Sequence, residues 1–194
     1  MWSLKRCWIW LCRMGHCRGF GVQSPWAYQL VRYVINEHWP YYCYADLSSS
    51  TMSNDWLSQH LGRLYFRLSN YMQAQQMVDY CPETDDWQHY LHNGNLKANV
   101  LRVETADALR ALPRVELLRM SLTGDYKTAF WASLQKVEAS SLIILQDIWR
   151  DATTKAFWRE VQADARCTTT FDLYYCGLVF FDAKRYKKNY IINF

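Results

Sequence analysis

The sequence predicts an α/β protein in which a mostly parallel sheet carries helices on both faces and ends in an antiparallel hairpin. Strand and helix patterns alternate from residue 77 to residue 164, and such alternation is typical of a parallel sheet. From residue 168 the pattern changes to two apolar segments separated by Cys176-Gly177, which indicates a tight hairpin. At 194 residues the chain is long enough to bury a core and is expected to form one compact unit.

The composition indicates a folded protein without a membrane span. Hydrophobic residues make up 51% and charged residues 21%, and the net charge of +4 is too small to imply a nucleic-acid partner by itself. The apolar run Trp8–Cys12 is too short for a secretory signal, and no stretch approaches the roughly 20 apolar residues of a transmembrane helix. The seven cysteines cannot all pair within the chain. We therefore expect free thiols in a reducing cytoplasm.

The first 22 residues are rich in Trp, Cys and Arg and show no sustained period. We expect this segment to dock on the fold through its tryptophans, Trp2, Trp8 and Trp10. Because cations stand among them, contact with a membrane surface or RNA is the alternative. A metal site is less expected, because zinc-binding cysteines usually begin about two to four residues apart. The candidate ligands instead recur at intervals of five residues: Cys7, Cys12 and Cys17, with His16 beside the last.

Two helices are predicted before the first strand. Ser24 can cap the first helix, Pro25 suits its first position, and Trp39-Pro40 ends it. A polar loop is expected at Ser48–Asn54. We expect residues 1–72, an N-terminal segment with these helices, to pack on an α/β domain formed by residues 73–194. The second helix is capped by Asn54 or Asp55, and its apolar stripe is Leu57, Leu61, Leu64, Leu68 and Met72, with Gln59, Arg63 and Arg67 turned away.

The alternating pattern assigns the remaining elements. The predicted strands are Met77–Cys81, Asn99–Val103, Val115–Leu122, Ser141–Leu145, the hairpin strands Thr168–Tyr175 and Leu178–Phe181, and a final edge strand, Tyr190–Phe194. The predicted helices are Asp85–His92, Ala106–Leu112 with Thr105 as its cap, Tyr126–Val137, and one that Asp151 caps and that runs to Asp164.

Four blocks carry a family resemblance: Gly21–Trp26, Leu61–Leu68, Asp147-Ile148 and Phe171–Phe181. In this order they resemble small bacterial class I S-adenosylmethionine-dependent methyltransferase-like proteins of the O-methyltransferase kind. Gly21–Trp26 is similar to the family's Gly-Val-His-Ser-Pro-Phe, and Leu61–Leu68 is similar to the helix before its first strand. Asp147-Ile148 resembles part of its Asp-Asp-Ile-His segment, and Phe171–Phe181 resembles its terminal hairpin. The resemblance implies a class I methyltransferase-like, Rossmann-like sheet. The segment between Glu104 and Val115 is short for this family, which predicts that one edge strand is lost.

The departures from the family lie at the expected cofactor site. The family's first strand ends in Glu-Leu-Gly-x-x-x-Gly, whereas this chain has Asp79-Tyr-Cys-Pro-Glu83, without a glycine. Pro82 removes a backbone donor, and Glu83, Asp85 and Asp86 place carboxylates where the cofactor's own carboxylate would lie. By resemblance, the candidate cofactor residues are Asp79, Cys81, Glu83, Glu104 for the ribose hydroxyls, and Gly124. Glu104 could equally be an exposed residue at a helix start.

By the same resemblance, Asp147 is the candidate catalytic residue. The family's paired aspartates become Gln146-Asp147. Magnesium is usually bound by one or two carboxylates together with substrate oxygens, and with a single carboxylate left we expect no metal. His89 and His92 are further candidates near a methyl acceptor. The alternative interpretation makes Asp147 a turn residue and both histidines surface residues.

Three functions remain open at this stage. The first is a methyltransferase-fold protein with an eroded S-adenosylmethionine site, filled by side chains such as Tyr80, Trp87 and Tyr90, that acts by binding a protein partner or a second copy. The second is an active S-adenosylmethionine-dependent O-methyltransferase on a small hydroxyl-bearing substrate. The third is a nucleic-acid or membrane-surface binder that uses basic aromatic termini, although no nucleic-acid motif supports it.

Overall fold

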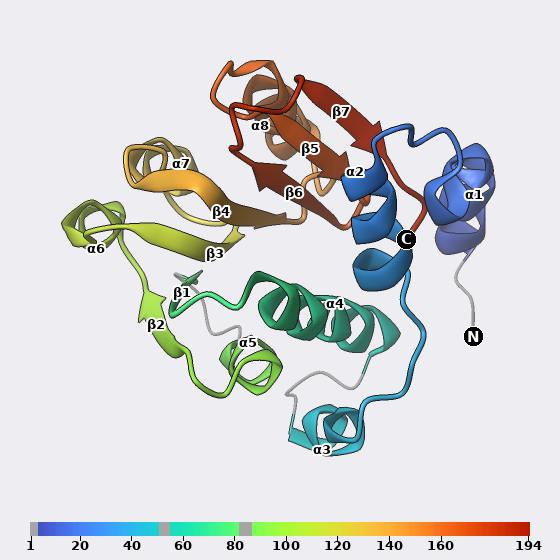
Figure 1. Cartoon of the computed structure of the whole chain (residues 1–194), viewed down its shortest axis with the longest axis horizontal. Coiled ribbons are helices and arrows are strands. Elements are labelled where there is room, and N and C mark those ends of the chain that lie inside the picture. The colour runs from blue at the N-terminus through green and yellow to red at the C-terminus, as the bar shows by residue number, and fades with distance from the viewer. Residues whose placement is uncertain (1–3, 51–54, 82–86) are drawn as a thin grey trace.

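The structure is a computed structural model that describes residues 4–50, 55–81 and 87–194 (Figure 1). It contains a seven-stranded sheet of order β2-β1-β3-β4-β6-β5-β7. Strand β6 runs antiparallel to both neighbours, and every other neighbouring pair is parallel. The strands are β1 Gln76–Tyr80, β2 Asn99–Val103, β3 Val115–Ser121, β4 Val137–Gln146, β5 Thr169–Asp172, β6 Cys176–Phe180 and β7 Lys188–Ile191.

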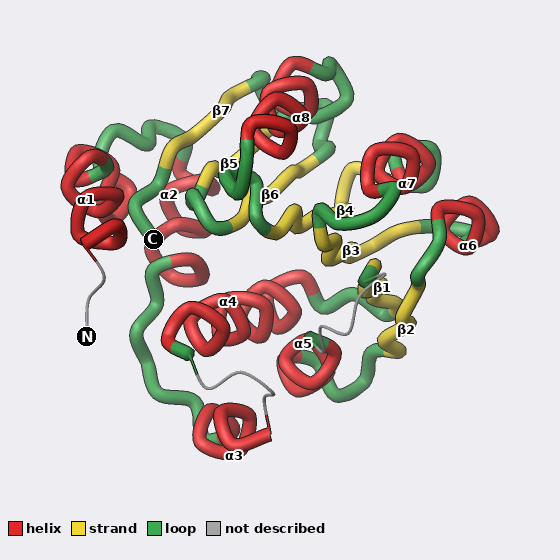
Figure 2. Tube along the Cα trace, turned by 180° about the vertical axis from the view of Figure 1, so that it is seen from behind, coloured by secondary structure: helices red, strands yellow, loops and turns green. Residues whose placement is uncertain are grey.

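Helices cover both faces of this sheet, as Figures 1 and 2 show from opposite sides. One face carries α2 (Pro25–Leu30), its continuation as a π-helix (Val31–Ile35), α4 (Trp56–Met72) and α5 (Gln88–Gly94). The other carries α6 (Ala106–Ala111), α7 (Tyr126–Ser133) and α8 (Ala152–Ala163). The fold is therefore Rossmann-like, and the antiparallel β6 between β4 and β5 is the class I methyltransferase arrangement that the sequence predicts. None of the described helices is both long and apolar enough to cross a membrane.

Strand alternation divides the core into two parts, because successive side chains of a strand point to opposite faces. Met77 packs in the core under α4 and α5, whereas Val78 and Tyr80 pack in the core under α6 to α8. Leu117 and Leu118 of β3 divide in the same way. Both faces are buried, which explains the nearly continuous apolar strands.

The edge beyond β2 lacks a strand, as the short segment predicts. The connection from β2 to β3 is described throughout, and it contains α6 and no strand. Strand β2 therefore forms one edge of the sheet, and β7, parallel to β5, forms the other.

The predicted helix caps are confirmed. The Ser24 side chain accepts a hydrogen bond from the Ala27 backbone N–H (3.4 Å), and Thr105 caps α6. Asp55 Oδ1 accepts hydrogen bonds from the first turn of α4. Asp151 and Thr154 form a capping box at α8. Each cap satisfies backbone donors that the first helical turn leaves without an intrahelical acceptor.

The predicted hairpin turn at Cys176-Gly177 is wrong, since both residues lie within β6. The turn is instead formed by residues 173–175, where Tyr174 has a φ of 71°. Gly177 is required for packing, because a Cβ atom there would lie 2.6 Å from the Trp158 ring of α8. A glycine that signals a turn in the sequence here allows a close approach between helix and strand.

Arg67 was predicted to face away from the core, but it is 6% exposed. Its Nε and Nη2 atoms donate to the carbonyl oxygens of Val34 (2.6 Å) and Ile35 (3.0 Å). It thereby provides hydrogen-bond donors to carbonyl oxygens at the end of the π-helix. This π-helix covers the side of α4 on which Arg67 lies.

Several boundaries differ from the prediction. The first helix ends at Ile35, well before Trp39, and the expected loop at Ser48–Asn54 is helical up to Ser50, within α3 (Cys43–Ser50). Residues 51–54 lie outside the described part, as do residues 85–86 at the predicted start of α5. α7 is shorter and β4 longer than predicted, because β4 begins at Val137 and pairs with Val115 across a register shift. β7 is Lys188–Ile191, displaced from the predicted Tyr190–Phe194.

The N-terminal segment forms α1 (Leu4–Cys12) and a 3-10 turn (Met14–Gly19). Docking through its tryptophans is wrong for the two that are described, since Trp8 is 69% and Trp10 43% exposed. The segment is attached instead through Arg13 and by Asn193 near the other end of the chain, whose backbone N–H donates to the His16 carbonyl oxygen (3.0 Å).

Candidate functional site

The carboxyl ends of β1, β3 and β4 meet at one edge of the sheet, the edge where open α/β sheets place their ligand sites. Asp79 of β1 and Arg119 of β3 are register partners and both lie on the face covered by α4 and α5. Arg119 Nη1 lies 2.9 Å from Asp79 Oδ1, and its Nη2 donates to Gln146 Oε1 of β4 at 2.8 Å. Three neighbouring strands thus contribute one polar side chain each to a connected network.

This network is fully enclosed. The side chains of Asp79 and Arg119 are both 0% exposed. Burial lowers the pKa of Arg119, but the Asp79 carboxylate and then Tyr65 raise it by more, so that its pKa lies above the usual value. Arg119 is therefore charged, and its charge is balanced within the protein, as a buried ion must be.

Aromatic side chains of α4 and of the segment that begins α5 cover the network on its helical side. The Tyr65 hydroxyl donates to Gln146 Oε1 (3.0 Å), and burial raises the pKa of this fully buried phenol. The Trp87 ring lies 5.4 Å from the Arg119 guanidinium carbon and packs edge-on against Tyr65. Tyr90 is buried beside Trp87. Tyr80, which was expected with them, faces the opposite core.

The candidate cofactor residues on β1 are engaged with other parts of the protein. Asp79 faces Arg119, and the Cys81 backbone N–H donates to the Val103 carbonyl oxygen (3.0 Å), which extends the pairing of β1 with β2. The Cys81 side chain is 0% exposed. Glu83 lies outside the described residues.

Glu104 and Gly124 are at the ends of the neighbouring strands but are exposed. Glu104 pairs with Arg102 (3.4 Å) and precedes the cap of α6, which fits its interpretation as a helix-start residue. Gly124 has a φ of 60° in the turn before α7, a conformation that favours glycine. His89 and His92 are exposed on α5.

Asp147 lies directly after β4 in a left-handed conformation, with a φ of 63°. Its backbone N–H donates to the Tyr175 carbonyl oxygen (2.7 Å), and its carbonyl accepts from the Arg150 N–H (3.1 Å). Burial raises the pKa of the Cys176 thiol most, and the charge of Asp147 raises this pKa further. The structure thus places Asp147 in the turn that follows β4. In the described ranges, no three His, Cys, Asp or Glu side chains are grouped to hold a metal ion.

Two polar clusters escaped the sequence analysis. The first is centred on Arg119, whose only sequence signal is an arginine inside an apolar strand. The second is centred on Asp172 at the carboxyl end of β5, which is 3% exposed. Asp172 Oδ2 accepts from Trp149 Nε1 (2.8 Å) and Trp158 Nε1 (3.1 Å), and its Oδ1 accepts from Arg13 Nη2 (2.6 Å). This carboxylate therefore joins the N-terminal segment to the sheet.

Comparison with known proteins adds little to what the structure shows. No family model matches the chain, and no curated protein matches it. Among solved structures, phosphoethanolamine N-methyltransferase 2 of Haemonchus contortus in complex with S-adenosyl-L-methionine is similar, with a TM-score of 0.38 and 17% identity over 50% of this chain and 27% of that one. The same enzyme with phosphomonomethylethanolamine and S-adenosylhomocysteine gives a TM-score of 0.37 and 18% identity over the same shares. Likenesses this distant carry no information on activity.

Proposed function

We propose that the protein is a methyltransferase-fold protein without methyltransferase activity, which acts by binding. The observation that supports this is the buried ion pair between Asp79 and Arg119. It occupies the edge of the sheet where the family resemblance would place the methionine end of S-adenosylmethionine.

A cofactor at this edge would need groups that are already engaged. Asp79 is neutralised by Arg119, and the Cys81 N–H is used in pairing with β2. Separating a buried ion pair costs about 3–5 kcal/mol, since it leaves an uncompensated charge. A cost of this size lowers an association constant by a factor of roughly 100 or more.

The test is calorimetric titration with S-adenosylmethionine and S-adenosylhomocysteine, together with the melting temperature at millimolar ligand. We expect neither heat nor a shift. Saturable binding would contradict the proposal, because a ligand at about 100 times its dissociation constant adds about 2.7 kcal/mol of stability.

A second candidate function is an active S-adenosylmethionine-dependent O-methyltransferase, which the position of Asp147 favours. Asp147 directly follows β4 at the carboxyl edge of the sheet, where a carboxylate could take a proton from an acceptor hydroxyl. Transfer of a labelled methyl group to a panel of small phenols or alcohols, lost in Asp147→Asn, is the result that would establish it.

A third candidate is binding of a membrane surface through α1. Leu4, Trp8 and Leu11 recur at helical spacing and are all exposed. Sedimentation with anionic vesicles tests it, and binding that is unchanged in Trp8→Ser would contradict it.

A further inference from the structure

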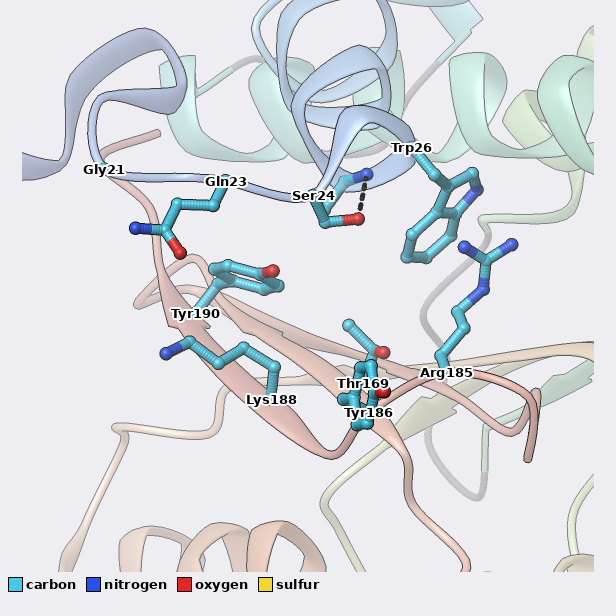
Figure 3. A pocket seen from close by; sticks show the side chains of 10 residues that line it. Gly21, Gln23, Ser24, Trp26, Thr169, Arg185, Tyr186, Lys188 and Tyr190 are labelled. Carbon is cyan, nitrogen blue, oxygen red and sulfur yellow. Dashed lines mark hydrogen bonds between the residues drawn. The ribbon is translucent and has the colours of Figure 1, made fainter.

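A cavity of about 450 Å³ lies between the start of α2 and the strands β5 and β7 (Figure 3). Thr169 and Lys188, the first residues of these two strands, both line it. The cavity is therefore at the amino edge of the sheet, opposite the edge that holds Asp79 and Arg119. Its volume falls within the roughly 300–1,000 Å³ typical of small-molecule sites.

The lining of this cavity is cationic. Arg185 and Lys188 contribute their side chains, and no carboxylate is among the described residues that line it. Asp182 contacts Arg185 at Nε (3.0 Å), and the terminal guanidinium nitrogens make no other hydrogen bond to a described residue. Lys188 forms no ion pair within the described ranges. Arg185 is paired with Asp182 only through Nε, which leaves its terminal nitrogens available, and together with Lys188 these groups favour an anionic occupant.

Arg185 is held in place for such an occupant. Its guanidinium carbon lies 3.9 Å from the centre of the Trp26 ring. Trp26 is itself fixed, because it packs edge-on against Phe180 (5.0 Å) and its Nε1 donates to the Tyr71 hydroxyl (2.9 Å). A guanidinium fork fixed over a ring loses little entropy when it binds a phosphate or carboxylate.

Thr169 supplies a polar group that an occupant of the cavity could use. The residue lines the cavity, and its hydroxyl makes no hydrogen bond to a described residue. The neighbouring Thr168 and Thr170 hydroxyls both have partners, the Phe180 carbonyl (3.0 Å) and the Asn189 side chain (2.9 Å). The Thr169 hydroxyl is accessible from the cavity and is not enclosed, so a group in the cavity can take it as a hydrogen-bond partner.

Aromatic surface completes the cavity. Figure 3 shows Gln23, Ser24 and Trp26 on one side and Lys188, Tyr190 and Thr169 on the other, facing one another. Tyr190 is held by stacking on Phe171 (5.1 Å between ring centres).

We propose that this cavity binds a small organic anion that joins a phosphate to a planar ring, the chemistry of a mononucleotide. Arg185 and Thr169 contact the phosphate, the exposed Lys188 side chain turns toward it from the orientation in Figure 3, and the tyrosines contact the ring. This proposal is independent of the proposed function.

Calorimetric titration with adenosine monophosphate, adenosine and inorganic phosphate tests the proposal. We expect saturable binding of adenosine monophosphate and binding of the other two that is at least about tenfold weaker. Lys188→Ala should weaken binding of adenosine monophosphate by about tenfold. The matched control is Lys97→Ala, which removes an exposed cation elsewhere and should leave the affinity unchanged.

Thr169→Val separates a binding role from a structural one, since it keeps the shape and removes the hydroxyl. We expect several-fold weaker binding with a melting temperature that is equal or higher. The proposal is overturned if adenosine monophosphate shows no saturable binding, or if both Lys188→Ala and Thr169→Val bind it as the unaltered chain does. Phosphate alone binding as tightly would overturn the role of the ring, and a fall in the melting temperature of Thr169→Val would overturn the argument from its hydroxyl.

Discussion

At the scale of the residue, Asp79 and Arg119 form the ion pair that most constrains the molecule. Both side chains are fully buried, in neighbouring strands and in register. Their attraction offsets the cost of removing two charges from water only while both are present. The stability of the fold therefore depends on the presence of both charges.

Arg119→Met should destabilise the fold by about 3–5 kcal/mol, because it leaves the Asp79 charge buried without its counter-ion. The double variant Asp79→Leu/Arg119→Met should be less destabilised than Arg119→Met alone, since no unpaired charge remains. Urea unfolding of the single and double variants measures this difference. Additive losses would show that the two charges act independently.

His60 should make stability depend on pH. The imidazole lies between the rings of Trp56 and Phe194, and burial first, then the cations Arg67, Arg63 and Arg6, lowers its pKa to about 3. The unfolded chain therefore binds the proton first as the pH falls. The His60 contribution is lost progressively below about pH 6.5, by at most roughly 1.4 kcal/mol per pH unit.

The measurement for His60 is urea unfolding at several pH values between neutrality and pH 4. His60→Phe, which keeps the ring stack, should lose less stability on acidification than the unaltered chain. Parallel pH profiles of the two proteins would be the contrary result.

Single residues were the hardest part to predict from the sequence. The partner of Asp79, Arg119, was missed because it lies forty positions away and only strand pairing brings the two together. Asp172 likewise received no role from the sequence, because its hydrogen-bond donors Arg13, Trp149 and Trp158 come from other segments of the chain. Local pattern carries no information on such partners.

At the scale of the element, the β6–α8 contact depends on Gly177. Gly177→Ala should destabilise the fold by about 1–3 kcal/mol, because its Cβ would lie 2.6 Å from the Trp158 ring. Gly15→Ala is the matched control, since a Cβ there meets nothing within 4 Å. Thermal unfolding of both variants gives the comparison, and equal melting temperatures would refute the close contact.

Most elements could be predicted because their signals are local. Ser24, Asp55, Thr105 and Asp151 mark helix starts by their own hydrogen bonds, and strand β2 matches its predicted bounds. The errors arose where tertiary contacts determine the role of a residue. Gly177 lies against the Trp158 ring, and Arg67 is covered by the π-helix.

At the scale of the whole molecule, hydrogen bonds join the N-terminal segment to the C-terminal end of the chain. Arg13 bonds to the Asp172 carboxylate and to the Ile192 carbonyl (3.3 Å), and Asn193 Nδ2 donates to the Trp10 carbonyl (3.2 Å). The N-terminal segment is thereby attached to the carboxyl end of β5 by polar contacts, while much of its apolar surface is exposed.

Arg13→Met should release this segment without unfolding the sheet. Hydrogen exchange followed by mass spectrometry should show faster exchange for residues 4–19 and unchanged exchange for β1 and β3. Arg18→Met, which changes an exposed arginine of the same segment, is the control. Uniformly faster exchange in the sheet would show that Arg13 supports the whole core instead.

The ion pair between Asp79 and Arg119 also bears on how this chain can change by mutation. A cofactor site at the carboxyl edge could arise only if both charges changed together, because either single replacement leaves a buried, unbalanced ion. Each one-step route to such a site therefore crosses a less stable intermediate. Selection for stability alone retains the pair.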